Sequence, residues 1–147
     1  MCIGEGLSLH TCDAPQEVVL DEDLRFKTVV STLGRGCTAL NPAECGGSAA
    51  GREQILHLRM PMAAEVSVTV IAGGIENALG PEWDASAYMV TSCGDASSFS
   101  GECATIAGGS TATVTGSFQA DQDVYIYIDG QNTEAEGSAS LEVLLTP

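Results

Sequence analysis

Acidic and amide side chains gather in three clusters that could bind a hard cation such as calcium. The clusters are Asp21, Glu22 and Asp23, then Asp121 and Asp123, and finally Asp129, Asn132, Glu134 and Glu136. Calcium takes several carboxylate and carbonyl oxygens at about 2.4 Å, but no cluster has the register of an EF-hand. Two interpretations remain open for the stretch 129 to 137, a calcium site or a solvent-exposed turn. Calcium is the one cofactor that the residues suggest.

Aromatic side chains supply a second kind of candidate site. In the stretch 123 to 130, Tyr125 and Tyr127 alternate with three aliphatic residues, so that the two tyrosines share one face of a strand. They could stack against sugar rings or a partner strand, or pack across the sheet as strand aromatics commonly do. Trp83, the one tryptophan, is either a buried lid at one end of the fold or an exposed anchor.

Catalytic motifs are absent from the sequence. It contains no G-x-S-x-G elbow, P-loop, H-E-x-x-H or deaminase-type zinc pattern. The stretch GRGCTA at 34 to 39 lacks a following helix that could bind phosphate. His57 alternates outward beside Arg59 with no nucleophile at a fixed spacing. We therefore expect no enzymatic activity.

The six cysteines indicate disulfides, because none has the C-x2-C spacing of a zinc site. Six cysteines formally allow 15 connectivities. Proximity in the sequence favours three local pairs, Cys2 with Cys12, Cys37 with Cys45, and Cys93 with Cys103. Disulfides persist outside the reducing cytosol, so a secreted or cell-surface location is expected.

Composition excludes several partners. The chain has 147 residues with 20 acidic and 5 basic side chains, and its net charge of -15 would repel nucleic acid and anionic membrane surfaces. No apolar run reaches the 18 residues or so that a membrane-spanning helix needs, and no signal peptide is readable. The length predicts one domain over 1–147, with an N-terminal part at 1–50 and a more regular part at 51–147.

Alternating apolar residues predict an all-β chain without helices. Strands are expected at 2–11, 16–20, 24–32, 55–60, 66–71, 85–92, 102–107, 110–118, 123–129 and 140–145. The last two are expected to pair as an antiparallel hairpin. Eight to ten short strands predict a disulfide-stapled, two-sheet antiparallel β-sandwich of jelly-roll type.

The order of these strands resembles that of the bacterial pre-peptidase C-terminal domain. The matching stretches are GREQILHLRMPMAAEVSVTV at 51 to 70, WDASAYMVTSC at 83 to 93, STATVTGSFQADQDVYIYIDG at 110 to 130, and SASLEVLL at 138 to 145. The resemblance covers roughly 51–145. The chain departs from the family in Trp83, in a methionine-bearing strand and in its long first third. The resemblance implies a calcium-tolerant, generally non-catalytic β-sandwich that accompanies secreted bacterial proteins, and no binding residue can be carried over.

Two function classes follow. The first is a non-catalytic extracellular module that binds a polymer or surface partner, with Tyr125, Tyr127 and Trp83 as its ligand surface. The second is a structural subunit that assembles with copies of itself through exposed strand edges. Divalent cations would relieve the repulsion between such acidic copies.

Overall fold

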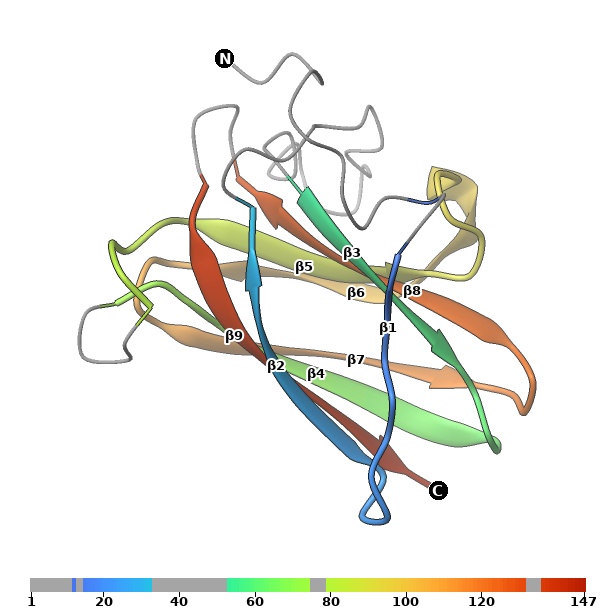
Figure 1. Cartoon of the computed structure of the whole chain (residues 1–147). Coiled ribbons are helices and arrows are strands. Elements are labelled where there is room, and N and C mark those ends of the chain that lie inside the picture. Colours follow the sequence, from blue (N-terminus) through green and yellow to red (C-terminus); the bar gives the residue numbers. More distant parts are fainter. Residues whose placement is uncertain (1–11, 13–14, 33–52, 75–78, 132–135) are drawn as a thin grey trace.

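Two β-sheets face each other across a common apolar core (Figure 1). The structure is a computed structural model that describes residues 12, 15–32, 53–74, 79–131 and 136–147. Its strands are β1 (Gln16–Glu17), β2 (Arg25–Ser31), β3 (Glu53–Arg59), β4 (Ala64–Ala72), β5 (Ala85–Val90), β6 (Phe99–Ile106), β7 (Thr111–Phe118), β8 (Asp123–Gly130) and β9 (Ser138–Thr146). A short 3-10 helix, η3 (Ala96–Ser98), precedes β6.

Sheet A has the strand order β1-β3-β8-β5-β6, and sheet B has the order β2-β9-β4-β7. All neighbours are antiparallel except β1 and β3, which run parallel over two residue pairs. The predicted all-β, two-sheet sandwich is therefore confirmed. The described part of the chain holds no helix long and apolar enough to cross a bilayer.

The core follows from strict alternation along the strands. In β4, Val66, Val68 and Val70 point inward and are fully buried, whereas the residues between them are partly exposed. β9 shows the same pattern, with Leu141 and Val143 inward. Because successive side chains in a strand point to opposite faces, each sheet gives one face to the core and presents the other outward.

The expected hairpin between the last two strands is wrong. β8 lies in sheet A between β3 and β5, and β9 lies in sheet B between β2 and β4. The two strands therefore belong to different sheets, whereas a hairpin turn of two to five residues joins neighbours in one sheet. Of the consecutive described strands, β5 and β6 alone pair with each other.

The other expected strands agree with the structure to within a few residues, except at 16–20, where β1 is only two residues long. The strand expected at 2–11 lies outside the described residues.

Candidate functional site

The outer face of sheet A is largely closed. A second apolar cluster of Ile55, Tyr88, Val90 and Tyr127 covers it, and Phe99 and Tyr125 pack against this cluster. The rings of Tyr88 and Tyr127 stack with centroids 5.0 Å apart. Tyr127 has no exposed surface, so of the two alternatives for the tyrosines it follows packing across the sheet and not a platform, and of the two only half-buried Tyr125 reaches the surface.

The loop after β5 covers Tyr127. The backbone N–H of Gly94 donates a 2.9 Å hydrogen bond to the Tyr127 hydroxyl oxygen. Burial raises the pKa of Tyr127 to about 12, although this hydrogen bond acts in the opposite direction. The phenol is thus held neutral and inaccessible at physiological pH.

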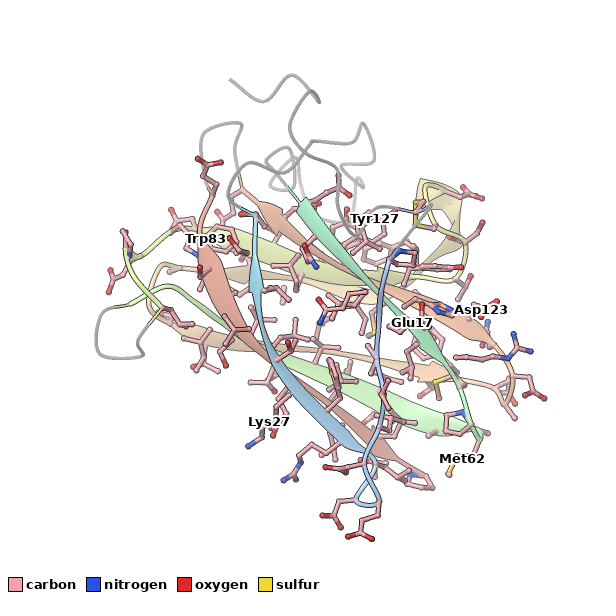
Figure 2. The ribbon with its side chains drawn as sticks, viewed as in Figure 1. Glu17, Lys27, Met62, Trp83, Asp123 and Tyr127 are labelled. Carbon is pink, nitrogen blue, oxygen red and sulfur yellow. A yellow bond between two sulfur atoms is a disulfide. The ribbon has the colours of Figure 1, made fainter. Side chains whose placement is uncertain are left out.

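Trp83 belongs to the core and not to a ligand surface. Its side chain is buried with the main apolar cluster, and its Nε1–H donates a 2.7 Å hydrogen bond to the carbonyl oxygen of Ser138. Figure 2 places it at the end of the sandwich where β9 begins. The tryptophan therefore caps the core, and the alternative of an exposed anchor is overturned.

The disulfides are not the expected local pairs. Cys12 is bonded to Cys93, across 81 positions of sequence, so neither Cys2–Cys12 nor Cys93–Cys103 exists. Cys103 is also in a disulfide. The expected pair Cys37–Cys45 and the residue Cys2 lie outside the described residues. The Cys12–Cys93 bond ties the chain before β1 to the loop that follows β5.

Two of the acidic residues on the outer face of sheet A are buried together. Glu53 and Asp129 are direct neighbours on β3 and β8, and both side chains are withdrawn from solvent. Burial, together with the Glu53 charge, raises the pKa of Asp129 well above its ordinary value. Asp129 therefore holds a proton to higher pH than an exposed aspartate does, and it lies buried in strand β8 and not in an open loop.

The other expected calcium ligands do not gather around Asp129. Asp121 and Asp123 lie at the opposite end of β8, about 20 Å away for a strand of this length. Asp123 instead contacts His57, and Asn132 and Glu134 lie outside the described residues. Among the described residues, no group of three or more His, Cys, Asp and Glu side chains is arranged so that it could hold a metal ion. The expectation of calcium at the 129–137 stretch remains a prediction.

At the open edge of sheet A, His57 lies between two carboxylates. Its Nδ1 is 2.8 Å from Oε1 of Glu17 on β1, and its Nε2 is 2.9 Å from Oδ1 of Asp123 on β8. Figure 2 shows Glu17 and Asp123 close together on the same side of the sandwich. The Tyr125 ring lies 4.9 Å from the imidazole. Because both ring nitrogens face carboxylates, the imidazole has no free nitrogen that could serve as a base for a substrate.

The outer face of sheet B, in contrast, is open. Its side chains come from the positions that alternate with the core residues of the four strands. Most carry hydroxyl groups: Ser31, Ser67, Thr69, Thr111, Thr113, Thr115, Ser117, Ser138, Ser140 and Thr146. Serine and threonine hydroxyls both donate and accept hydrogen bonds, so this face can bind polar ligands in many orientations.

One row across this face combines charge with hydroxyls. The register places Lys27, Glu142, Thr69 and Thr113 side by side on β2, β9, β4 and β7. Lys27 Nζ is 3.3 Å from Glu142 Oε2, and the Thr69 and Thr113 hydroxyl oxygens are 3.0 Å apart. A hollow lies along this row, and it is lined by Lys27, Thr69, Ile71, Ser140, Leu141 and Glu142.

Charge also distinguishes this face from the rest of the chain. Of the three basic residues in the described part of the chain, Arg25 and Lys27 lie here and both contact Glu142. With Glu65 included, the face carries two positive and two negative side chains in a protein of net charge -15. It can therefore approach another molecule with little electrostatic repulsion.

Sequence reasoning missed this face. Its signal was available, since serine or threonine occupies every outward position of β7 and several of β4 and β9. What could not be read was that β2, β9, β4 and β7 are neighbours, because the strands come from distant parts of the chain. The buried contact between Tyr88 and Asp129 was missed for the same reason.

Comparison with known proteins identifies the fold. No protein-family model matches the chain, and no curated protein is significantly similar in sequence. Among solved structures, the pre-peptidase C-terminal domain of collagenase from Bacillus anthracis superposes with a TM-score of 0.50 at 12% identity, over 87% of this chain and 92% of that one. Tripeptidyl peptidase 2 also gives 0.50, at 8% identity, over 90% of this chain and 10% of that one.

The chain therefore spans about a tenth of tripeptidyl peptidase 2 but nearly the whole collagenase domain. At these identities the likeness concerns the fold, and it agrees with the strand order quoted above for residues 51 to 145. The chain has the β-sandwich fold of a pre-peptidase C-terminal domain.

Proposed function

We propose that this chain is a secreted, non-catalytic module that binds an extracellular polymer through the outer face of sheet B. The observation that carries the proposal is the contrast between the two outer faces. Sheet A is covered by its own aromatic cluster, whereas sheet B presents four strands of hydroxyl side chains and a hollow. A nearly neutral face made of four strands suits a repetitive ligand, which can form many weak contacts at once.

Two further observations support the proposal. The Cys12–Cys93 disulfide is consistent with a location outside the reducing cytosol. The contacts of both His57 nitrogens with carboxylates argue against its use as a general base. Single hydroxyl contacts contribute only about 0.5–1.5 kcal/mol each, so affinity would come from the number of rows that the ligand covers.

Co-sedimentation with a panel of insoluble polysaccharides and fibrous proteins tests the proposal. Thr69→Glu places a charge in the middle of the hollow and should reduce binding at least about tenfold, or about 1.4 kcal/mol. Gln119→Glu is the matched control, because it adds the same charge at an exposed turn between β7 and β8. If the Thr69→Glu variant folds and binds as well as the wild type, the outer face of sheet B is not the binding surface. No binding to any member of the panel would count against the polymer as ligand.

Self-assembly is a second candidate, which one observation favours. β2 forms an edge of sheet B among the described strands, and Val29 on it is 63% exposed beside the nearly neutral face. Two copies could meet there with little repulsion. A light-scattering mass well above 15.1 kDa, lowered by Val29→Lys, would support this function. If the protein is a monomer at all concentrations, self-assembly is contradicted and polymer binding remains as the proposed function.

A further inference from the structure

Strand β1 is attached to sheet A by very little backbone pairing. It pairs with β3 only at Gln16 with Leu56 and at Glu17 with His57. One further backbone hydrogen bond, 2.8 Å long, runs from the Val18 N–H to the His57 carbonyl oxygen. So short a parallel ladder is weak by itself. Side-chain contacts must therefore contribute much of what holds β1 in place.

Two side-chain contacts join β1 to β3: Gln54 Nε2 donates a 3.1 Å hydrogen bond to Gln16 Oε1, and the charged contact passes through the His57 side chain. Nδ1 of His57 lies 2.8 and 3.0 Å from the two carboxylate oxygens of Glu17. Nε2 lies 2.9 Å from Oδ1 of Asp123. The imidazole thus connects β1 to β8 across β3. Its side chain is 17% exposed, whereas that of Glu17 is 61% exposed.

The protonation state of His57 decides whether both contacts can exist. Ionised carboxylates accept hydrogen bonds and donate none, and a neutral imidazole has one N–H and one bare nitrogen. Only the doubly protonated ring can donate to Glu17 and Asp123 together. When the ring is neutral, a lone pair faces one of the two carboxylates, and that contact becomes repulsive.

The other groups around the ring fit this view. Arg59 Nη1 lies 3.5 Å from the same Asp123 oxygen and partly neutralises that carboxylate. Tyr125 lies against the ring face, where its aromatic electrons favour a cation. Burial alone would lower the pKa of His57, but the hydrogen bonds to Asp123 and Glu17, with their charges, outweigh it and raise the pKa above its ordinary value.

We propose that His57 is a protonation-dependent latch that holds β1 on the edge of sheet A through Glu17. The latch is closed below the ordinary histidine pKa of about 6.5 and opens as the pH rises through the higher value of the folded protein. Opening weakens the attachment of β1, so that the edge of β3 becomes uncovered more often. An uncovered edge of this kind can accept a strand from another chain.

Hydrogen exchange at the Val18 amide and NMR titration of His57 test the latch. Protection factors, which correct for the intrinsic rise of exchange with pH, should fall at least about tenfold at Val18 between pH 6 and pH 9. In Glu17→Gln, a neutral His57 can donate to Asp123 and accept from the side-chain amide introduced by the substitution, so the protection should change less than about twofold. The titration midpoint of His57 should fall in this variant.

Glu65→Gln is the matched control, because it removes an exposed carboxylate from sheet B and should keep the wild-type fall in protection. If Glu17→Gln does not fold, Asp123→Asn makes the same test from the other ring nitrogen. Equal protection of Val18 at both pH values in the wild type would overturn the proposal. A fall in protection as large as that of the wild type in Glu17→Gln or Asp123→Asn would also overturn it.

Discussion

The hydroxyl of Tyr88 donates a 2.7 Å hydrogen bond to Oδ2 of Asp129, in a region where both side chains are shielded from solvent. Oδ1 of Asp129 is equally buried and has no hydrogen-bond partner in the described part of the chain. A carboxylate in such surroundings is costly unless it carries a proton. The contact thus joins β5 to β8 while imposing a penalty that depends on pH.

We expect Asp129→Asn to stabilise the protein at alkaline pH. The folded pKa of Asp129 is raised, so its contribution to stability is present below about pH 4 and is lost as the pH rises through the folded pKa. Asparagine does not ionise and keeps an acceptor for Tyr88. The melting temperature of the variant minus that of the wild type should therefore increase as the pH rises above 4. A difference that does not change with pH would contradict the raised pKa.

Removing the Tyr88 hydroxyl should expose the cost of leaving Asp129 unpaired. Tyr88→Phe keeps the ring stacking on Tyr127 and should lower the free energy of unfolding by about 1–3 kcal/mol. When Tyr88→Phe is made in the Asp129→Asn background, its cost should be smaller than in the wild type, because the side chain at position 129 can no longer ionise. Urea unfolding of all four proteins measures the coupling, and strict additivity would show that the two groups are independent.

Gly137 leaves room for Trp83, and adding a methyl group there should disturb the core. A Cβ atom on Gly137 would lie 2.7 Å from Nε1 of Trp83, against atoms of a buried ring that cannot move far. Gly137→Ala should therefore cost about 1–3 kcal/mol and shift the emission of the one tryptophan.

Gly80→Ala provides the contrast for that experiment. Apart from its chain neighbours, no atom of the described residues lies within 4 Å of its Cβ position, but its φ is +76°, so its cost of about 1–2 kcal/mol would come from the backbone. We expect Trp83 emission to stay unchanged in this variant. If Gly137→Ala also leaves the emission unchanged, the described packing of Trp83 is wrong.

The Cys12–Cys93 bond should contribute strongly to stability, because it closes a long loop. In the chain-entropy model, a loop of about 80 residues corresponds to about 4 kcal/mol. The double variant Cys12→Ser with Cys93→Ser should lose a comparable free energy of unfolding in urea. Peptide mapping of the wild type under non-reducing conditions should yield the Cys12–Cys93 peptide. A Cys2–Cys12 peptide in its place would contradict the structure.

Much of the fold could be predicted from local patterns. The alternation of Val66, Val68 and Val70 with polar neighbours located β4 and its inward face, and β9 was predicted in the same way. The aromatic surface was predicted wrongly by the same reasoning, because alternation says which side chains share a face but not what covers that face. Tyr127 faces away from the core, as expected, and is nevertheless buried under a second cluster.

The sequence by itself determined the class of the protein: an acidic, disulfide-bonded, all-β chain whose strand positions follow from a repeat of two residues. Such features depend on a residue's nearest neighbours along the chain, so they can be read without knowing the fold. Only the tertiary structure decided that β9 pairs with β2 and β4, that Cys12 bonds to Cys93, and that His57 meets Glu17 and Asp123. These contacts join residues tens of positions apart, and packing of the whole sandwich selects them from the many pairings that the local patterns allow.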